Sequence, residues 1–281
     1  MSELEMTRQI QLKALECLRE VKRICQKNGI PYFLSWGTAL GAKRHGGFIP
    51  WDDDVDIGMF YPDYQRFLEA CQEDLNTDSF FLQTPQTDPH TLMPYAKLRM
   101  NNTTSLDQRY SHIPMHWGLC IDIFPLRFAP DSPFKRKQLV FWGKMVRLTQ
   151  QKEIVGGRKR KILDLLSAAA GGDEKLKALA VKKVDKLCVD RCEAKDVFDV
   201  EGISDQRIFY PISLVEHTKE LRFEDDTFPC PDPVEDYLSH LYGDFMTPPV
   251  QGERTGHTGI LIDLEHSYLD YTDSKRETVK N

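Results

Sequence analysis

The chain has 281 residues, of which 41% are hydrophobic and 28% charged, and its net charge is −6. This composition is typical of a soluble globular protein with one large domain or two smaller ones, and the acidic balance argues against a nucleic-acid partner. The N-terminal stretch lacks the apolar core of a secretory signal, and no apolar run approaches the roughly 18 residues of a membrane span. Seven cysteines without a CxxC pair indicate reduced thiols. We therefore expect a cytoplasmic protein.

Predicted helices and strands are mixed through the first half of the chain. Apolar residues at helical spacing predict a helix over residues 2–28, which Asn28-Gly29 ends. A second helix is expected to start near Gly37, and a third to be capped by Asp63 and to run to Leu75. The predicted strands are 32–36, 55–59, 80–83, 95–100 and 119–124. This mixture predicts an α/β (α+β) fold, with a mixed sheet flanked by helices.

The composition changes near residue 134. Residues 135–161 contain ten Lys or Arg residues and a single acidic residue. AAAGG at 168–172 predicts a joint before another helical stretch. We interpret residues 134–195 as a helical insertion, partly basic, within a single domain that spans residues 1–281. A further helix is predicted over residues 233–242.

The segment SWGTALGAKRHGGFIPWDDDVDIGM, residues 35–59, contains four aspartates within five positions. Because strand side chains alternate between faces, Asp54 and Asp56 should point to the same side, Asp53 should point away, and Asp52 should precede the regular strand. Asp122 stands alone in the apolar run LCIDIFPL, where burying an acid is costly unless it is paired or binds a metal. Asp54, Asp56 and Asp122 therefore predict a site for one or two Mg²⁺ or Mn²⁺ ions.

Three other interpretations of the acidic run compete with this metal site. An EF-hand calcium loop counted from Asp52 fails, because its sixth position is Ile57 instead of glycine and its twelfth is Asp63 instead of glutamate. A solvated acidic turn is disfavoured by the hydrophobic residues that alternate with the acids. The DxD motif of a sugar-nucleotide glycosyltransferase relies on the same acid chemistry and stays open.

The order of these motifs resembles the nucleotidyltransferase superfamily: Gly37-Thr38 after an apolar strand, then Asp54-x-Asp56, then Asp122 between apolar residues. Together with YAKLRMNNTT and IDIFPL, the segment at 35–59 is similar to the LicD family of phosphocholine transferases, itself distantly similar to fukutin. VEDYLSHLYGDFMTPPVQGERTGHTG adds a less specific C-terminal match, so the resemblance covers most of the chain. It implies a nucleotidyltransferase-like mixed sheet.

The resemblance also implies a reaction: transfer of phosphocholine from CDP-choline to a sugar hydroxyl, with release of CMP. The acceptor would be a lipid-linked, cell-surface glycan precursor of teichoic acid or lipopolysaccharide. Divalent ions would bridge phosphate oxygens, with Asp122 either as general base or as a ligand of the metal that activates the hydroxyl. Gly37 would let the backbone approach the phosphates, and Thr38 would add a hydroxyl donor. Further expected contacts to the nucleotide or in a closing loop are Lys43, Arg44, His45, Lys97, Arg254 and His257.

Recognition of choline, which has no hydrogen-bond donor, should need an aromatic cage. The candidate walls are Trp36, Trp51, Tyr95, Tyr110 and Trp117, and Trp51, next to the acids, is preferred. Arg127 departs from many relatives, which carry an acid there, and we expect it to affect surface or acceptor contacts and not metal binding.

Several alternatives stay open at the level of the sequence. The basic segment 135–161 is either a solvated helix face or a contact with anionic membrane at its inner face. The reaction is phosphocholine transfer, transfer of another alcohol phosphate from a CDP carrier, or nucleotidyl transfer in the narrower sense. A catalytically inactive binding protein is disfavoured because all three acids are present.

Overall fold

A mixed sheet of seven strands lies at the centre of the molecule. The computed structural model describes residues 3–199, 208–249 and 260–271. The strands are β1 (Phe33–Leu34), β2 (Asp56–Phe60), β3 (Phe80–Gln83), β4 (Ala96–Met100), β6 (Cys120–Phe128), β7 (Asp196–Asp199) and β8 (Phe209–Pro211). They run in the order β1-β2-β6-β4-β3, and β7 and β8 extend the sheet from the end of β6. β2 and β6 are parallel, whereas the other pairs are antiparallel. The expected mixed sheet is confirmed.

Two small antiparallel pairs lie outside this sheet. They are β5 (Thr104–Asp107) with β11 (Ile260–Asp263), and β9 (Thr218–Phe223) with β10 (Asp226–Pro231). The sequence patterns predicted none of these four strands, because each strand is short and its residues do not alternate cleanly between apolar and polar.

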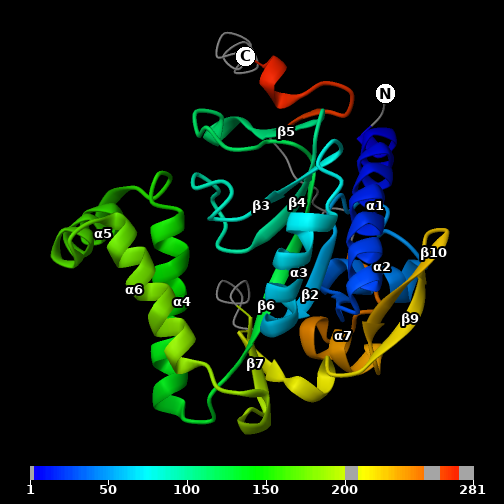
Figure 1. Cartoon of the computed structure of the whole chain (residues 1–281). Helices are drawn as coiled ribbons and strands as arrows, with labels where there is room; N and C mark the ends of the chain where they lie inside the picture. Colours follow the sequence, from blue (N-terminus) through cyan, green and yellow to red (C-terminus); the bar gives the residue numbers. More distant parts are fainter. Residues whose placement is uncertain (1–2, 200–207, 250–259, 272–281) are drawn as a thin grey trace.

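Seven helices complete the described fold (Figure 1). They are α1 (Glu3–Asn28), α2 (Trp36–His45), α3 (Tyr61–Asp74), α4 (Pro133–Gln150), α5 (Gly157–Ala170), α6 (Asp173–Leu187) and α7 (Val234–Tyr242). α1 and α3 pack on each other and on the central strands, and α2 packs on α7, β2 and β9. α4, α5 and α6 form a group beside the sheet, on the opposite side of the molecule from β9 and β10.

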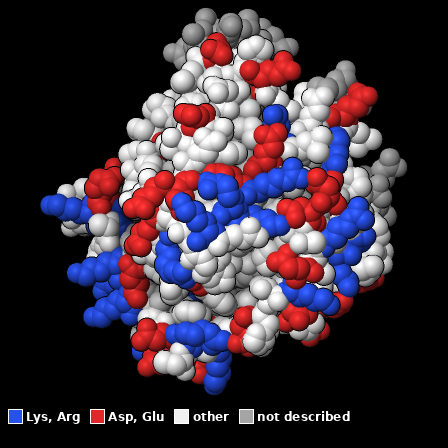
Figure 2. Space-filling model, turned by 45° about the vertical axis from the view of Figure 1, so that its right-hand side comes forward, with Lys and Arg blue, Asp and Glu red and all other residues white. Residues whose placement is uncertain are grey.

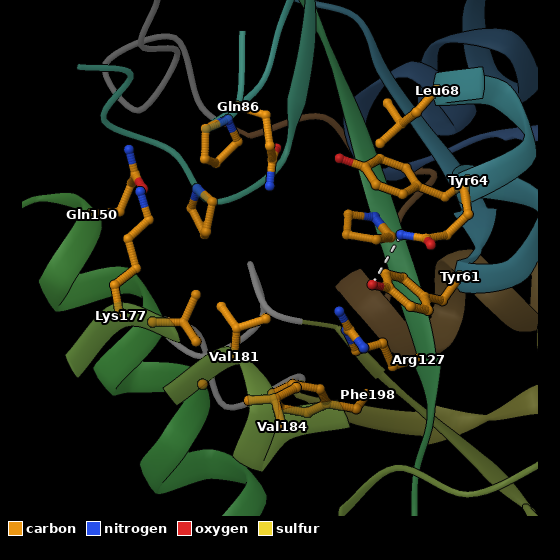
Figure 3. A pocket seen from close by; sticks show the side chains of 16 residues that line it. Tyr61, Tyr64, Leu68, Gln86, Arg127, Gln150, Lys177, Val181, Val184 and Phe198 are labelled. Atoms are coloured by element: carbon orange, nitrogen blue, oxygen red, sulfur yellow. Dashed lines mark hydrogen bonds between the residues drawn. The ribbon is translucent and has the colours of Figure 1, made fainter. Parts of the chain in front are cut away.

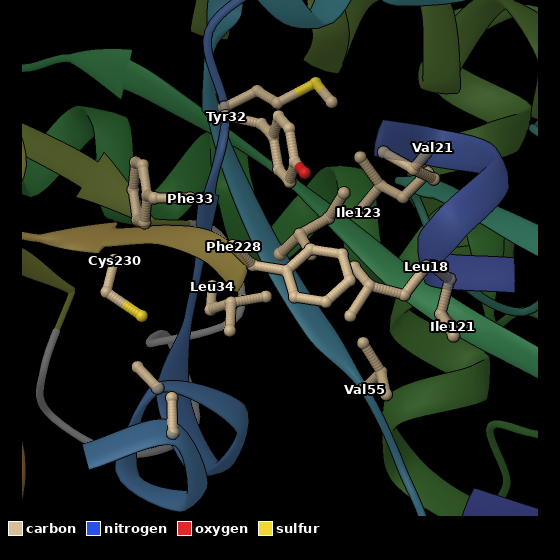
Figure 4. Close-up of a cluster of buried hydrophobic side chains, with 14 of the residues drawn as sticks. Leu18, Val21, Tyr32, Phe33, Leu34, Val55, Ile121, Ile123, Phe228 and Cys230 are labelled. Carbon is tan, nitrogen blue, oxygen red and sulfur yellow. The ribbon is translucent and has the colours of Figure 1, made fainter. Parts of the chain in front are cut away.

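The main core forms between α1 and the central strands (Figure 4). Leu18 and Val21 of α1 are fully buried near Ile121 and Ile123 of β6, with Phe228 of β10 beside them. Burial of side chains of this size stabilises the fold by roughly 1.5–3 kcal/mol each. Ile121 and Ile123 therefore face the core, and Asp122, which lies between them, points to the opposite face of β6 because successive strand residues alternate.

Two predictions about where elements begin or end were wrong. Asp63 is not the cap of α3, since the helix begins at Tyr61 and Phe60 occupies the cap position, with Pro62 in the first turn where its missing N–H costs nothing. Trp36 opens α2 instead of ending a strand, and it does so with a φ of 45°. The helices expected over 2–28 and 233–242 and the strand over 80–83 are confirmed.

The region predicted as a helical insertion contains α4, α5 and α6, and its limits as a separate unit stay a prediction. The AAAGG joint ends α5, with Gly171 and Gly172 at φ +85° and +127°, backbone angles that favour glycine. Among the described helices, none combines the length and apolar character needed to cross a bilayer. All seven cysteines are free thiols, as predicted.

Candidate active site

A row of four polar residues crosses four neighbouring strands. β2 and β6 align Asp56 with Asp122, β6 and β4 align Asp122 with Lys97, and β4 and β3 align Lys97 with Gln83. Residues directly opposite each other on paired strands project to the same face of a sheet. Asp56, Asp122, Lys97 and Gln83, called the polar row below, therefore share the face opposite the α1 core.

Asp122 is held by two side chains at the start of β4. Lys97 Nζ lies 2.5 Å from Asp122 Oδ1, and the Tyr95 hydroxyl donates to Asp122 Oδ2 at 3.1 Å. The side chains of Lys97 and Asp122 are only 14% and 20% exposed. Burial lowers the pKa of Lys97 and the charge of Asp122 raises it, with a net rise. The lone acid of an apolar strand is thus paired with a cation, which offsets the cost of its burial.

Asp56 is a partly buried acid that faces other acids. Its backbone N–H donates to Thr38 Oγ1 at 2.8 Å, which joins the first residue of β2 to α2. Burial, followed by the charges of Asp54, Asp122 and Asp52, raises the pKa of Asp56 well above its usual range. Carboxylates this close favour either a shared proton or a bound cation.

Gly37 allows α2 to approach the acidic loop. A Cβ atom at Gly37 would lie 2.8 Å from Asp52 Oδ2. From the other side, the Gln11 side-chain amide donates to the carbonyl oxygens of Ile49 and Asp52, at 3.1 and 2.8 Å. The loop is therefore positioned between α1 and the start of α2. The close approach that we predicted for a phosphate is made here by a carboxylate.

A cavity of about 270 Å³ opens at the polar row. Its charged lining residues are Asp53, Asp54, Lys97, Arg99, Asp107 and Asp122. We predicted that Asp53 would point away from the site, yet it lines the same cavity as Asp54. The prediction failed because hydrogen-bonded strand begins only at Asp56, so strict alternation does not apply upstream of it.

Arg99 is a cavity residue that the sequence analysis missed. It is 5% exposed, and its guanidinium donates to Gln83 Oε1 at 2.6 Å and to the Gly118 carbonyl oxygen at 2.7 Å. Both acceptors are neutral, and within residues 3–199, 208–249 and 260–271 no carboxylate pairs with it. The available signal was its position in YAKLR, two residues after Lys97 and therefore on the same face. A buried guanidinium with neutral partners is well placed to bind an anionic ligand.

The aromatic candidates divide into two groups. Tyr110 and Trp117 line the cavity, and Tyr95 contacts Asp122. Trp36 and Trp51 are not among the residues that line it and instead pack against the main core. The cavity therefore contains aromatic walls, but not the tryptophan that we preferred.

The three basic residues of GAKRH lie at the far end of α2. Lys43 pairs with Glu235 of α7, and Arg44 donates to the Phe245 carbonyl oxygen at 2.8 Å and to His45 Nε2 at 3.0 Å. None of the three lines the cavity. A helix of ten residues separates its ends by about 15 Å. Their predicted role as phosphate contacts stays a prediction, without support from this geometry.

A metal site is compatible with the donor chemistry but is not preformed. Within the described ranges, no group of three or more Asp, Glu, His or Cys side chains is already arranged to hold a metal ion. The clustered carboxylates supply the hard oxygen ligands that Mg²⁺ and Mn²⁺ prefer. The pKa of Asp56 is raised first by burial and then by the neighbouring acids. The ligand set Asp54, Asp56 and Asp122 stays a prediction. Arg254 and His257 lie outside the described residues.

A second cavity, of about 160 Å³, lies between α3 and the helices α4 and α6 (Figure 3). Tyr61 and Tyr64 enter it from α3, Arg127 from β6, and Lys177 from α6. The Arg127 guanidinium carbon lies 3.5 Å from the centre of the Tyr61 ring, and Arg127 Nη1 lies 2.6 Å from Asp185 Oδ1. None of the residues predicted to bind metal or nucleotide lines this cavity.

Comparison with known proteins identifies relatives that match most of the chain and others that match a short segment. Residues 29–154 match the model of a family described as LicD/FKTN/FKRP, nucleotidyltransferase domain. The chain is 27% identical over 263 residues to the lipopolysaccharide cholinephosphotransferase LicD of Haemophilus influenzae, covering 89% of this chain and 95% of that protein. It is 47% identical over 53 residues to the human ribitol 5-phosphate transferase FKRP, covering 18% of this chain and 11% of that protein. The match to the human ribitol-5-phosphate transferase FKTN is 42% over 61 residues, or 22% and 13% of the two chains.

Proposed function

From the match of residues 29–154 to the family described as LicD/FKTN/FKRP, nucleotidyltransferase domain, and from the cholinephosphotransferase that matches most of the chain, we propose that this protein is a transferase that moves an alcohol phosphate from a CDP-alcohol to a glycan hydroxyl. The finer proposal is phosphocholine from CDP-choline. The cholinephosphotransferase of Haemophilus influenzae supports it, since the match covers 95% of that protein, whereas the matches to the human ribitol phosphate transferases cover 13% or less. As acceptor we propose a sugar of a teichoic-acid or lipopolysaccharide precursor.

The observation that carries this proposal is the cavity at the polar row. It brings Asp54 and Asp122 together with Lys97 and Arg99, so that acids and cations line one space. Phosphoryl transfer depends mainly on positioning and on neutralisation of the phosphate charge. A cavity with both kinds of charge can bind a diphosphate through its cations while its acids face the attacking hydroxyl.

The proposed reaction forms one bond and breaks one. The acceptor hydroxyl oxygen attacks the phosphorus that carries the alcohol, the bond from this phosphorus to the bridging oxygen breaks, and CMP leaves with that oxygen. Lys97 and Arg99 bind diphosphate oxygens, as their low exposure strengthens charge-assisted hydrogen bonds. The hydroxyl proton passes to a cavity carboxylate, for which we propose Asp122, and Tyr95 must then release Oδ2.

A divalent ion completes the proposal. Asp54, Asp56 and Asp122 would hold Mg²⁺ or Mn²⁺, which supplies charge neutralisation and lowers the pKa of the attacking hydroxyl. The support for this is geometric: Asp54 and Asp122 line one cavity, and Asp56 lies directly opposite Asp122 on the neighbouring strand. Burial, followed by the charges of the neighbouring acids, raises the pKa of Asp56, and an added cation would relieve the second of these effects.

The apolar part of the cavity supports a choline head group. Tyr110, Met115 and Trp117 line it beside the charged residues, with Ile260 and Ile262 from β11. Aromatic faces attract quaternary ammonium groups through the ring quadrupole, without any hydrogen bond. Ribitol, with several hydroxyl groups, would need polar partners in the same space.

The test is a donor panel. Purified protein is incubated with Mg²⁺, a glycan acceptor and CDP-choline, CDP-ribitol, CDP-glycerol or CDP-ethanolamine, and CMP release is measured. We expect CMP from CDP-choline above all others. CMP from CDP-ribitol instead would overturn the head-group assignment, and no CMP from any donor would overturn the transferase. Nucleotide retained on the acceptor, or transfer from a sugar nucleotide, would establish one of the alternatives.

A substitution at Asp56 tests the acids directly. Asp56→Asn removes one charge of the cluster and is expected to lower kcat by about a thousandfold or more, since phosphate neutralisation is the main catalytic contribution. Asp78→Asn, at an exposed position before β3, is the matched control and should keep full activity. Wild-type activity in Asp56→Asn would exclude Asp56 as a metal ligand.

A further inference from the structure

The helices α4 to α6 carry a charge opposite to that of the rest of the chain. Residues 133–187 contain fifteen Lys or Arg and five Asp or Glu, a net charge of +10, and the remaining residues carry −16. A segregation of this size is an electrostatic signal for an anionic partner. The proposed reaction takes place at the polar row, which belongs to the acidic remainder, so catalysis does not account for the basic helices.

α5 presents an apolar stripe to solvent. Ile162, Leu165 and Leu166 are 53%, 72% and 38% exposed, and Ala169, one turn further on, is also exposed. These positions follow the i, i+3, i+4, i+7 spacing of a single helix face. The buried positions of α5, Leu163 and Ser167, lie on a different side, toward the neighbouring helix α6. In Figure 1, α5 is the outermost of the three helices.

Basic side chains border this stripe. Arg158, Lys159 and Lys161 are exposed. At about 100° per residue, Lys159 and Lys161 fall on either side of the stripe and Arg158 lies at its N-terminal end. None of the three forms an ion pair with any described residue. Their neighbour Arg160 differs, since it pairs with Asp164.

From this arrangement we infer that α5 docks on the surface of an anionic lipid bilayer. The helix lies in the plane of the interface, with Ile162, Leu165 and Leu166 inserted at the boundary of the acyl chains and the lysines at the level of the lipid phosphates. An apolar stripe flanked by basic residues is the pattern of an interfacial helix. α5 has 14 residues and is too short to span a bilayer, so it lies on the membrane.

Two other occupants fit the surface less well. A nucleic acid would match the positive charge but offers nothing apolar to cover the exposed isoleucine and leucines. A second copy of the chain would cover the stripe, yet it would place two groups of helices of charge +10 against each other. A lipid surface supplies both an apolar interior and anionic head groups.

The test is flotation of the whole protein with vesicles. Vesicles of neutral phosphatidylcholine are compared with vesicles that contain phosphatidylglycerol in addition, at low and high salt. We expect binding to the anionic vesicles at least tenfold tighter than to the neutral ones, and weaker at high salt because free ions screen the attraction. Equal binding to both vesicles, or none to either, would overturn the inference.

Two variants separate the apolar and the electrostatic contributions. Ile162→Ser/Leu165→Ser/Leu166→Ser and Arg158→Glu/Lys159→Glu/Lys161→Glu should each weaken vesicle binding at least tenfold. Leu4→Ser, which removes a 67% exposed leucine from α1, is the matched control and should bind as wild type does. Circular dichroism and thermal unfolding should be unchanged in all of them, because the substituted side chains are exposed. Wild-type vesicle binding by either triple variant would contradict the proposed surface. Binding that RNA competes away, and that is the same for neutral and anionic vesicles, would also contradict it.

The same variants distinguish this inference from the proposed reaction. CMP release with a water-soluble acceptor is expected to be unchanged in both triple variants, because α5 does not line the cavity at the polar row. Loss of vesicle binding with intact CMP release supports the docking surface. Absence of CMP release from the wild type, with vesicle binding retained, would overturn the reaction alone.

Discussion

The polar row and the outer face of α5 concentrate charge in opposite ways. In the polar row, Lys97 and Asp122 lie 2.5 Å apart and are largely shielded from solvent, so each charge depends on its neighbour. On α5, Arg158, Lys159 and Lys161 are exposed and form no ion pair with any described residue. Buried charges that depend on each other favour a catalytic site, whereas exposed like charges beside an apolar stripe favour a surface that binds a partner.

On a third surface, charges of both signs are exposed and paired with each other. The side of the molecule that carries α1, β9 and β10 displays basic and acidic residues side by side (Figure 2). Ion pairs such as Arg8–Glu224 and Arg19–Asp225 join α1 to the β9–β10 ribbon. Exposed pairs of this kind contribute little to stability, typically about 0–1 kcal/mol each. Charge alone is therefore uninformative until burial and pairing are known.

The largest effect on stability should come from separating Lys97 and Asp122. Lys97→Met leaves a shielded carboxylate without its cation and is expected to cost about 3 kcal/mol in the free energy of unfolding. Lys97→Met/Asp122→Asn should recover more than half of that loss, while CMP release stays below about one thousandth of wild type. Urea unfolding and CMP assays measure the two quantities. If the stability losses of the two substitutions simply add, Lys97 and Asp122 are not coupled, and the difference from the independent charges of α5 disappears.

A change without charge tests whether geometry alone holds the acidic loop. A Cβ atom at Gly41 would lie 2.5 Å from the Gly47 carbonyl oxygen, so Gly41→Ala must push the loop away from α2. We expect a loss of about 2–3 kcal/mol and reduced activity, because the same loop carries the aspartates. The matched control is Gly156→Ala before α5, where no atom lies within 4 Å of the added Cβ and stability should change by less than about 0.5 kcal/mol. Equal melting temperatures for the two variants would contradict the contact.

The smallest effect is a pH dependence from a buried histidine. His116 accepts a hydrogen bond from the Gly118 N–H at 3.0 Å, and burial, followed by the charge of Arg99, lowers its pKa to about 4. The unfolded state has the ordinary pKa near 6.5, so it binds the proton first. Stability should therefore be nearly constant above about pH 7.5 and fall as the pH decreases, by about 1.4 kcal/mol at pH 5.5. His116→Gln should lack this part of the slope in urea unfolding, and parallel curves would refute the assignment. The always-charged cations of α5 should add no such slope.

The sequence predicted the parts of the site that depend on local pattern. Alternation placed Asp122 and Lys97 within strands that the structure confirms, and it explains why Ile57 and Ile123 face the core. The same rule failed for Asp53, which precedes the first residue of β2. Arg99 was missed although its spacing from Lys97 places both on one face, because its burial depends on Gln83 and Gly118, which other strands and loops supply.

Proximity along the chain was a poor guide to proximity in space. Lys43 and Arg44 precede the aspartates by only a few residues, but the helix α2 carries them to its far end, where they contact α7 and the loop after it. The cation at Asp122 comes instead from β4, 25 residues upstream.

By itself, the sequence determined the resemblance to a family, the acids, and the faces on which Asp122 and its apolar neighbours lie, because side-chain direction along a strand has a local period of two. Only the tertiary structure decided which strands are neighbours and in what register. Register set Asp56 against Asp122 and Asp122 against Lys97, and packing of α5 on α6 decided which of its faces stays exposed. Strand register and helix packing depend on contacts between distant segments. The free energy of these contacts is shared among many residues, so no short stretch of sequence predicts it.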